Sequence, residues 1–541
     1  MDQSFKSHHD ANTRPDEMFS QLPDPSMHDA RDRLALARLG KKQVLKVTEL
    51  WFAVRGRFQL YNFDYVGRNF GDWISRGGSA GLIYGYIMVW IGTLSVFITI
   101  SELASMAPTA GGQYHWVSML APTSSRRFLS YLTGWMTALA WQSAITSGGF
   151  LSGSLIQGLL VLNYPDKTFH PYQVTLLGYS CLLIAVFVNT VIVELLPSIE
   201  SIMLIIHIIG FFVVMIIISY MAPHSSAVDV FTVFSNGGGW PTQGLSVMVG
   251  LIGNVFSFTG ADAAVHMAEE IHNPAVNIPR AIIGSVFLNG LMGFGIMIAT
   301  LFGLGDIHTV LKTPTGYPFM QIFFQATESV GGSTAMASII VASGFFASLG
   351  FIATSSRMVW SFARDRALPF SSFLSKIDRR TSIPLNAVLV TTSIGGLILL
   401  ISIGSAIALN IILSINIFAF YSTYLASCSL LLWRRCTEEI RPHVPDADLE
   451  GVDLAQGLPR LSWGPWRVPG FLGIANNVFA CAYIVVILFF SFWPASLAPS
   501  LADMNWSIAI TGFFVLSSIG YYGVRGRKFY KGPLIDKDIL R

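Results

Sequence analysis

The chain has 541 residues, of which 52% are hydrophobic and only 12% charged, a composition too apolar for a soluble globular protein. The formal net charge of +3 is small and does not indicate a nucleic-acid partner. We therefore expect an all-α protein that crosses a lipid bilayer many times.

The first 47 residues are polar and carry several prolines and charges. Such a composition cannot bury enough apolar surface to fold, so residues 1–47 are predicted to form a disordered cytosolic tail. No apolar run stands near the N-terminus, and no cleavable signal peptide is expected.

The next segment, residues 48–78, is atypical because it is charged where a first membrane span is expected. Each charge would cost a few kcal/mol at the middle of a bilayer, so this segment should not insert as a free helix. Its charged residues are Glu49, Arg55, Arg57, Asp64, Arg68, Asp72 and Arg76.

Eleven runs beyond this segment are apolar and long enough to span a bilayer. Most are interrupted by Gly, Ser and Thr, which favour close helix packing in lipid. They predict a transmembrane domain over residues 79–524 and a cytosolic tail over 525–541. The runs are 80–106, 128–161, 172–193, 199–221, 243–268, 279–303, 332–356, 385–404, 405–432, 471–492 and 504–524.

Basic residues gather in every second connector, and the positive-inside rule places those connectors in the cytoplasm. The alternate connectors hold only Lys167 and Lys312. The span from Ala80 must then start outside, whereas the basic tail before residue 47 belongs inside. Three explanations are open: residues 48–78 cross with the shelter of neighbouring helices, the tail is stranded outside, or this stretch is not the one for which the fold was built.

Three long motifs carry a family resemblance. They are GLIYGYIMVWIGTLSVFITISELASMAPTAGGQYHW (81–116), LSVMVGLIGNVFSFTGADAAVHMAEEIHNPAVNIPRAI (245–282) and SRMVWSFARDRALPFSSFLSKID (356–378). The chain resembles amino-acid permeases of the amino acid–polyamine–organocation superfamily over roughly residues 79–530, specifically the fungal branch of GABA, choline and general amino-acid permeases. The resemblance implies a leucine-transporter-type fold, with two inverted five-helix repeats plus two helices and the first helix of each repeat broken at mid-membrane.

The run from Gln243 matches the second broken helix of that fold, and its centre carries the residues expected to bind substrate. The aromatic residues there match pocket positions in relatives, with plain packing as the alternative. Asp262 could face a substrate amine or cap the second half-helix. The predicted substrate-binding residues are Phe256, Ser257, Phe258, Thr259, Gly260 and Asp262.

His207 lies inside an otherwise apolar span, where an ionisable group suggests a function. Its ordinary pKa suits reversible protonation, and the resemblance implies that a basic group on this helix takes part in proton coupling. The alternative is a neutral imidazole bonded to a neighbouring hydroxyl or carbonyl.

Several charges close the apolar runs at the expected cytoplasmic face. Glu102 could gate or pair structurally with a loop arginine. Glu269, Glu270 and Arg357 could belong to an inner gate network with His266, Arg364 and Asp365, or to a solvated loop whose charge sets topology.

No metal ligand spacing, nucleotide-binding loop or hydrolase motif is present, so neither a metal, a cofactor nor enzymatic activity is expected. The cysteines Cys181, Cys428, Cys436 and Cys481 lie in or beside apolar runs and are expected to be free thiols.

The resemblance implies a secondary transporter that carries an amino acid or small amine with protons by alternating access. The expected partners are that substrate, protons, the lipid bilayer and ubiquitin ligases acting on the tails. The plasma membrane is the expected location, with the vacuole or another endomembrane as the alternative. Because residues 48–78 replace the first broken helix, two further interpretations are open: a transport-inactive receptor or regulatory protein, or a mis-spliced gene model of a functional permease.

Overall fold

The computed structural model describes residues 36, 39, 41, 69–404, 408–443, 461–501 and 504–534, which form helices joined by turns and loops. In these ranges ten helices are long and apolar enough to cross a bilayer. The prediction of an all-α multispanning membrane protein is therefore confirmed. The predicted tail 1–47 and the segment 48–78 lie outside the described residues except for 36, 39, 41 and 69–78, and the C-terminal tail is described as far as residue 534.

The spanning helices are α5 (Asn69–Met106), α7 (Arg126–Asn163), α8 (Pro171–Thr190), α9 (Leu196–Met221), α13 (Pro274–Phe302), α16 (Val330–Arg364), α18 (Leu385–Leu399), α20 (Ala408–Cys436), α21 (Gly470–Phe490) and α22 (Ser507–Tyr521). Shorter helices lie between them: α6 (Gln113–Leu120), α10 (Ala227–Thr232), α11 (Gln243–Ser257), α12 (Ala263–His266), α14 (Ile307–Leu311), α15 (Pro318–Thr327), α17 (Ser371–Leu374), α19 (Ile401–Gly404) and α23 (Arg527–Phe529).

Local sequence signals explain several helix starts. Proline stands in the first turn of α8, α9, α13 and α15, where its missing N–H is not needed. Thr242 and Ser329 cap α11 and α16 by accepting hydrogen bonds from the backbone N–H groups of Leu245 and Gly332.

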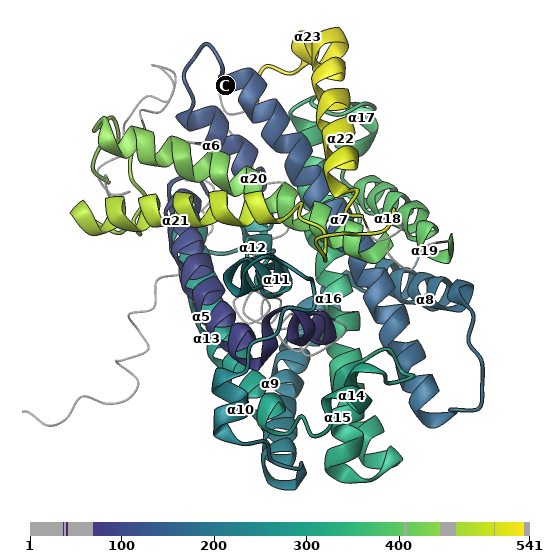
Figure 1. Cartoon of the computed structure of the whole chain (residues 1–541). Helices are drawn as coiled ribbons and strands as arrows, with labels where there is room; N and C mark the ends of the chain where they lie inside the picture. The colour runs from purple at the N-terminus through teal and green to yellow at the C-terminus, as the bar shows by residue number, and fades with distance from the viewer. Residues whose placement is uncertain are drawn as a thin grey trace, which may run out of the picture.

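The bundle has two ends, which Figure 1 shows at the bottom and the top of the view. The helices α10, α14 and α15 lie at one, which we call the outer end; α6, α17 and α23 lie at the other, which we call the inner end. The basic connectors belong to the inner end, which is the cytoplasmic end by the positive-inside rule.

Helix α5 starts earlier than the predicted span 80–106, and its first part packs at the outer end. Gly78 breaks the helix with a φ of 70°, and a side chain there would meet the backbone carbonyl of Val233. Ser246 donates a hydrogen bond to the carbonyl of Arg76 (2.6 Å), and Ile74 is buried. Residues 69–78 of the atypical segment are therefore integrated into the fold.

Lys41 lies at the inner end, where its ammonium group pairs with Asp365 immediately after α16. From Ala80 to Met106, α5 rises about 40 Å, so Lys41 and Gly78 lie at opposite ends of the bundle. The crossing predicted between residues 48 and 78 falls outside the described residues, but its two described flanks have the positions that a crossing requires.

Helix α7 is central and packs against α6, α8, α16 and α20. Its contact with α8 depends on glycine, because a side chain on Gly153 would lie 2.5 Å from the carbonyl oxygen of Val174. A side chain on Gly178 would likewise lie 2.7 Å from the carbonyl oxygen of Gly149. These two helices approach each other backbone to backbone, as small residues allow in a membrane.

This contact predicts that Gly153→Leu destabilises the protein by about 3 kcal/mol, since a backbone neighbour cannot move aside as a side chain can. Gly284→Leu in α13 is the matched control, because no atom lies within 4 Å of the added carbon there. The thermal unfolding midpoint of each variant in detergent measures the difference. Equal midpoints for the two variants would contradict the packing of α7 on α8.

Candidate functional site

The predicted run 243–268 is an interrupted helix. The helix α11 ends at Ser257, the chain turns through residues 258–262, and α12 resumes at Ala263. Gly260 has a φ of 80°, which other residues rarely adopt. The interruption leaves backbone groups without helical partners inside an apolar bundle, an arrangement that binds small polar ligands in membranes.

A small cavity of about 10 Å³ adjoins the interruption, with room for about one water molecule. Three predicted binding residues line it, whereas Phe256, Gly260 and Asp262 are absent from its lining. Ser285 and Asn289, one turn apart on α13, were missed by the sequence analysis, although polar side chains at this spacing inside an apolar span are a signal. The lining consists of Ser257, Phe258, Thr259, Ala261, Ser285, Val286 and Asn289.

Aromatic side chains of α5 cover the cavity residues on one side. The ring of Tyr86 lies 5.4 Å from that of Phe258, and its hydroxyl donates to the carbonyl of Gly290 (3.1 Å). Trp90 donates its indole N–H to the carbonyl of Val286 (3.2 Å). These bonds fix α5 against α13 and hold Phe258 in place. The other predicted part of the site is segment 48–78, of which residues 48–68 lie outside the described residues.

Asp262 occupies the first position of α12, but its side chain does not cap that helix. The expectation of a cap is therefore wrong. The carboxylate instead accepts hydrogen bonds from Gln113 of α6 (2.5 Å) and Tyr424 of α20 (2.6 Å). Asp262 is fully buried, and the donors on these two other helices satisfy its carboxylate.

His266 lies one turn beyond Asp262 at the end of α12. Its Nδ1 is 2.9 Å from the carbonyl oxygen of Ala110, and its Nε2 is 3.6 Å from Asp262 Oδ2. Gly112 has a φ of 53°, and a side chain there would press against the imidazole at 3.0 Å. The loop before α6 is thus shaped around the His266 ring.

The charges at the inner end are paired and buried, so the alternative of a solvated loop is wrong for them. Arg364 donates two hydrogen bonds to Glu269 (2.7 and 3.0 Å). Arg357 binds Glu270 in the same way (2.8 and 3.4 Å). Both glutamates belong to the segment after α12 and both arginines to α16, so these bonds close the inner end beneath the interrupted helix.

A second set of buried hydrogen bonds connects Lys41, near the N-terminus, and Leu534, near the C-terminus, to the end of α16. Asp365 accepts from Lys41 (2.6 Å), the Tyr114 hydroxyl (2.8 Å) and the backbone N–H of Leu534 (2.9 Å). Burial by itself raises the pKa of Asp365, but the charges of Lys41 and Arg364 outweigh it and hold this pKa below the usual value. Lys41 is buried, which corrects the expectation of a uniformly disordered tail at this residue.

Glu102 forms a separate contact near the inner end of α5. It accepts from Arg435 of α20 (2.6 Å) and from the backbone N–H of Val468 (2.9 Å), and it is fully buried. These bonds join α5, α20 and the residues before α21 away from the interrupted helix.

His207 is buried in α9, which packs against α13, α15 and α16. It does not line the cavity beside the interruption.

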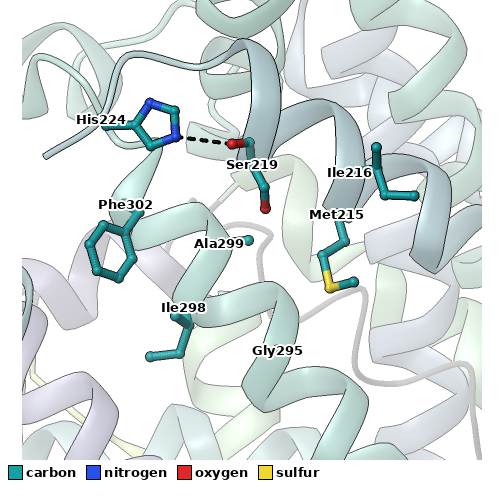
Figure 2. A pocket seen from close by; sticks show the side chains of 8 residues that line it. All are labelled: Met215, Ile216, Ser219, His224, Gly295, Ile298, Ala299 and Phe302. Carbon is teal, nitrogen blue, oxygen red and sulfur yellow. Dashed lines mark hydrogen bonds between the residues drawn. The ribbon is translucent and has the colours of Figure 1, made fainter.

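A second cavity, of about 400 Å³, is a different feature, drawn in Figure 2. It lies between α9 and α13 near the outer end, and it is lined mostly by apolar side chains such as Met215, Ile298 and Phe302. Ile216, another lining residue, is 60% exposed, so this groove opens toward the lipid. None of the predicted site residues lines it.

Metal binding has no support in the described part of the chain, where no group of three or more His, Cys, Asp or Glu side chains is placed to hold an ion.

Comparison with known proteins shows the family of this chain. The amino acid permease family model matches residues 66–514, beginning inside the atypical segment. A putative amino acid/polyamine transporter of Macrophomina phaseolina is 29% identical over 82% of this chain and 93% of its own length. The choline transporter of Saccharomyces cerevisiae is 28% identical (93% and 85%), and an amino-acid permease of Arabidopsis thaliana is 26% identical (85% and 87%). The chain belongs to the amino acid permease family of the amino acid–polyamine–organocation superfamily.

Proposed function

We propose that this protein is a secondary transporter that carries an amino acid or a related small amine, such as GABA or choline, across the plasma membrane by alternating access. The observation that carries the proposal is the interruption between α11 and α12, whose Ser257, Phe258 and Thr259 line a small cavity with α13. The backbone groups of the interruption and the hydroxyls of Ser257 and Thr259 suit the polar head of such a substrate, and the aromatic wall suits its apolar part.

Alternating access requires a barrier on each side of the site that opens in turn. The Glu269–Arg364 and Glu270–Arg357 pairs supply the inner barrier in this proposal, because they join the segment after α12 to α16. In the described state the cavity has room for about one water molecule, which is too little for an amino acid or a small amine.

The driving force in this proposal is proton symport, with His207 as the proton-binding group. Its support is a buried imidazole in an apolar span, where few groups titrate near neutral pH.

The unusual segment 48–78 bears on whether the chain as written is active. The family match starts at residue 66, so residues 48–65 lie outside it. This observation favours the mis-spliced gene model over a transport-inactive receptor, and sequencing the mature transcript across codons 40 to 80 distinguishes the two.

The function is tested by radiolabelled uptake of a substrate panel in a permease-deficient yeast. Two forms are compared: the chain as written, and a form in which a relative's first helix replaces residues 48–68. We expect uptake of an amino acid or small amine by the second form and much less by the first, because a broken helix should supply half of the polar backbone groups of the site. A replaced form that reaches the membrane and takes up no compound of the panel would contradict the proposal.

In the replaced form, His207→Gln should abolish the dependence of uptake on external pH and leave the amount of protein at the membrane unchanged. The reason is that a carboxamide retains hydrogen bonding without binding a proton in this range. Unchanged proton coupling in this variant would remove His207 from its proposed role.

The inner barrier predicts a third result. Glu269→Gln leaves the buried Arg364 without its counter-charge, and we expect a loss of about 3 kcal/mol from the closed state. Glu439→Gln is the matched control, because its pair with Arg434 is largely exposed on the glutamate side and should contribute less than about 1 kcal/mol. Labelling rates of a cysteine placed at Ala261 by an impermeant reagent from the inner side measure the opening, and equal rates in both variants would contradict this barrier.

A further inference from the structure

His266 has a defined tautomer because of its partner on the loop before α6. A backbone carbonyl can only accept, so the ring nitrogen 2.9 Å from the Ala110 oxygen must carry a hydrogen. In a neutral imidazole the other nitrogen then has a lone pair and no hydrogen. That nitrogen, Nε2, is the one that lies 3.6 Å from Asp262 Oδ2.

Two acceptors would thus face each other in a fully buried place if His266 were neutral and Asp262 ionised. Burial makes this repulsion costly, because no water screens it. One proton between the two groups removes the conflict, either on Nε2 as an imidazolium ion or on Oδ2 as a carboxylic acid. With that proton the pair has no net charge; without it the net charge is minus one.

Among the described residues, the groups in contact with the pair do not supply a counter-charge. Gln113 and Tyr424 donate neutral hydrogen bonds to Asp262, and Trp141 presents its ring at right angles to the imidazole with centroids 5.7 Å apart. Glu269 accepts a hydrogen bond from the Ala110 N–H (3.4 Å) and is itself paired with Arg364. The positive charge of Arg364 is therefore compensated by Glu269, and Arg364 does not serve as a counter-charge for Asp262.

The backbone of Ala110 connects the His266–Asp262 pair with the inner barrier. Its carbonyl accepts from His266, and its N–H donates to Glu269 of the inner barrier. A change of charge at the His266–Asp262 pair can therefore act through the backbone of Ala110 on the segment that closes the inner end.

We propose that His266 and Asp262 form a second proton-binding site, which holds one shared proton while the inner end is closed and releases it when that end opens. This inference rests on the proposed transport function and adds to the role given there to His207. Loss of the proton leaves a buried negative charge, which water or a cationic substrate head can compensate once the barrier opens.

The test is a pH titration of the full chain with ¹⁵N-labelled histidine, observed by NMR in lipid nanodiscs without substrate. We expect one imidazole whose signal disappears in His266→Gln and which is protonated in the closed protein. In Asp262→Asn the carboxamide can donate to Nε2, so the same ring should stay neutral over the whole titration. His115→Gln is the control, because His115 is a buried imidazole on α6 and not part of the His266–Asp262 pair, and this variant should leave the signal unchanged.

A His266 ring that titrates equally in the parent and in Asp262→Asn, or that stays neutral in both, would overturn the shared-proton site. The titration needs no substrate, so it can fail while uptake succeeds, or succeed in a protein that takes up nothing. A second readout is uptake by the form with a replaced first helix. Its ratio between acidic and neutral medium should fall toward unity in Asp262→Asn, whereas a merely structural role would lower uptake equally at both pH values.

Discussion

A carboxylate buried at the point where a helix is interrupted is the constraint on which this site depends. Lipid offers no water to Asp262, so its hydrogen bonds must come from other helices. Gln113 and Tyr424 donate hydrogen bonds to this carboxylate, and His266 lies beside it. These contacts bring α6, α20 and α12 together. The position of α6 is in turn fixed by the Tyr114 hydroxyl on Asp365, so two buried carboxyl groups, Asp262 and Asp365, organise the interrupted helix and the loops below it.

The inner end contains two kinds of charge with different responses to pH. Asp365 stays ionised, because Lys41 and Arg364 more than offset the rise in its pKa that burial causes. Its folded pKa lies below the unfolded one, so its contribution to stability is complete above the unfolded pKa and is lost only as the pH falls through the folded value. The contact of Lys41 with α16 is therefore insensitive to pH near neutrality, whereas an imidazole facing a carboxylate can respond there.

The sequence predicted the spans well because lipid imposes length and apolarity on every helix that crosses it. It also predicted the interruption after Ser257, since Gly260 and hydroxyl residues stand where the apolar run would otherwise continue. It failed where the answer depends on distant partners. Gln113 and Tyr424 lie 149 and 162 residues from Asp262 in the chain, so no local pattern could reveal that they, and not the end of α12, would satisfy its carboxylate.

The described residues on either side of the charged segment show where its two ends lie in the bundle. Lys41 is held at the inner end by Asp365, and Ile74 is buried at the outer end beside α11. The basic tail and the start of α5 therefore lie at opposite ends of the bundle, as the positive-inside rule requires. The contacts that hold them there do not involve the charges in between. The cavity beside Phe258 is bordered by α13, and Tyr86 of α5 packs against Phe258. Replacing residues 48–68 consequently changes the part of the site that the resemblance assigns to the first broken helix and leaves the described half as it is.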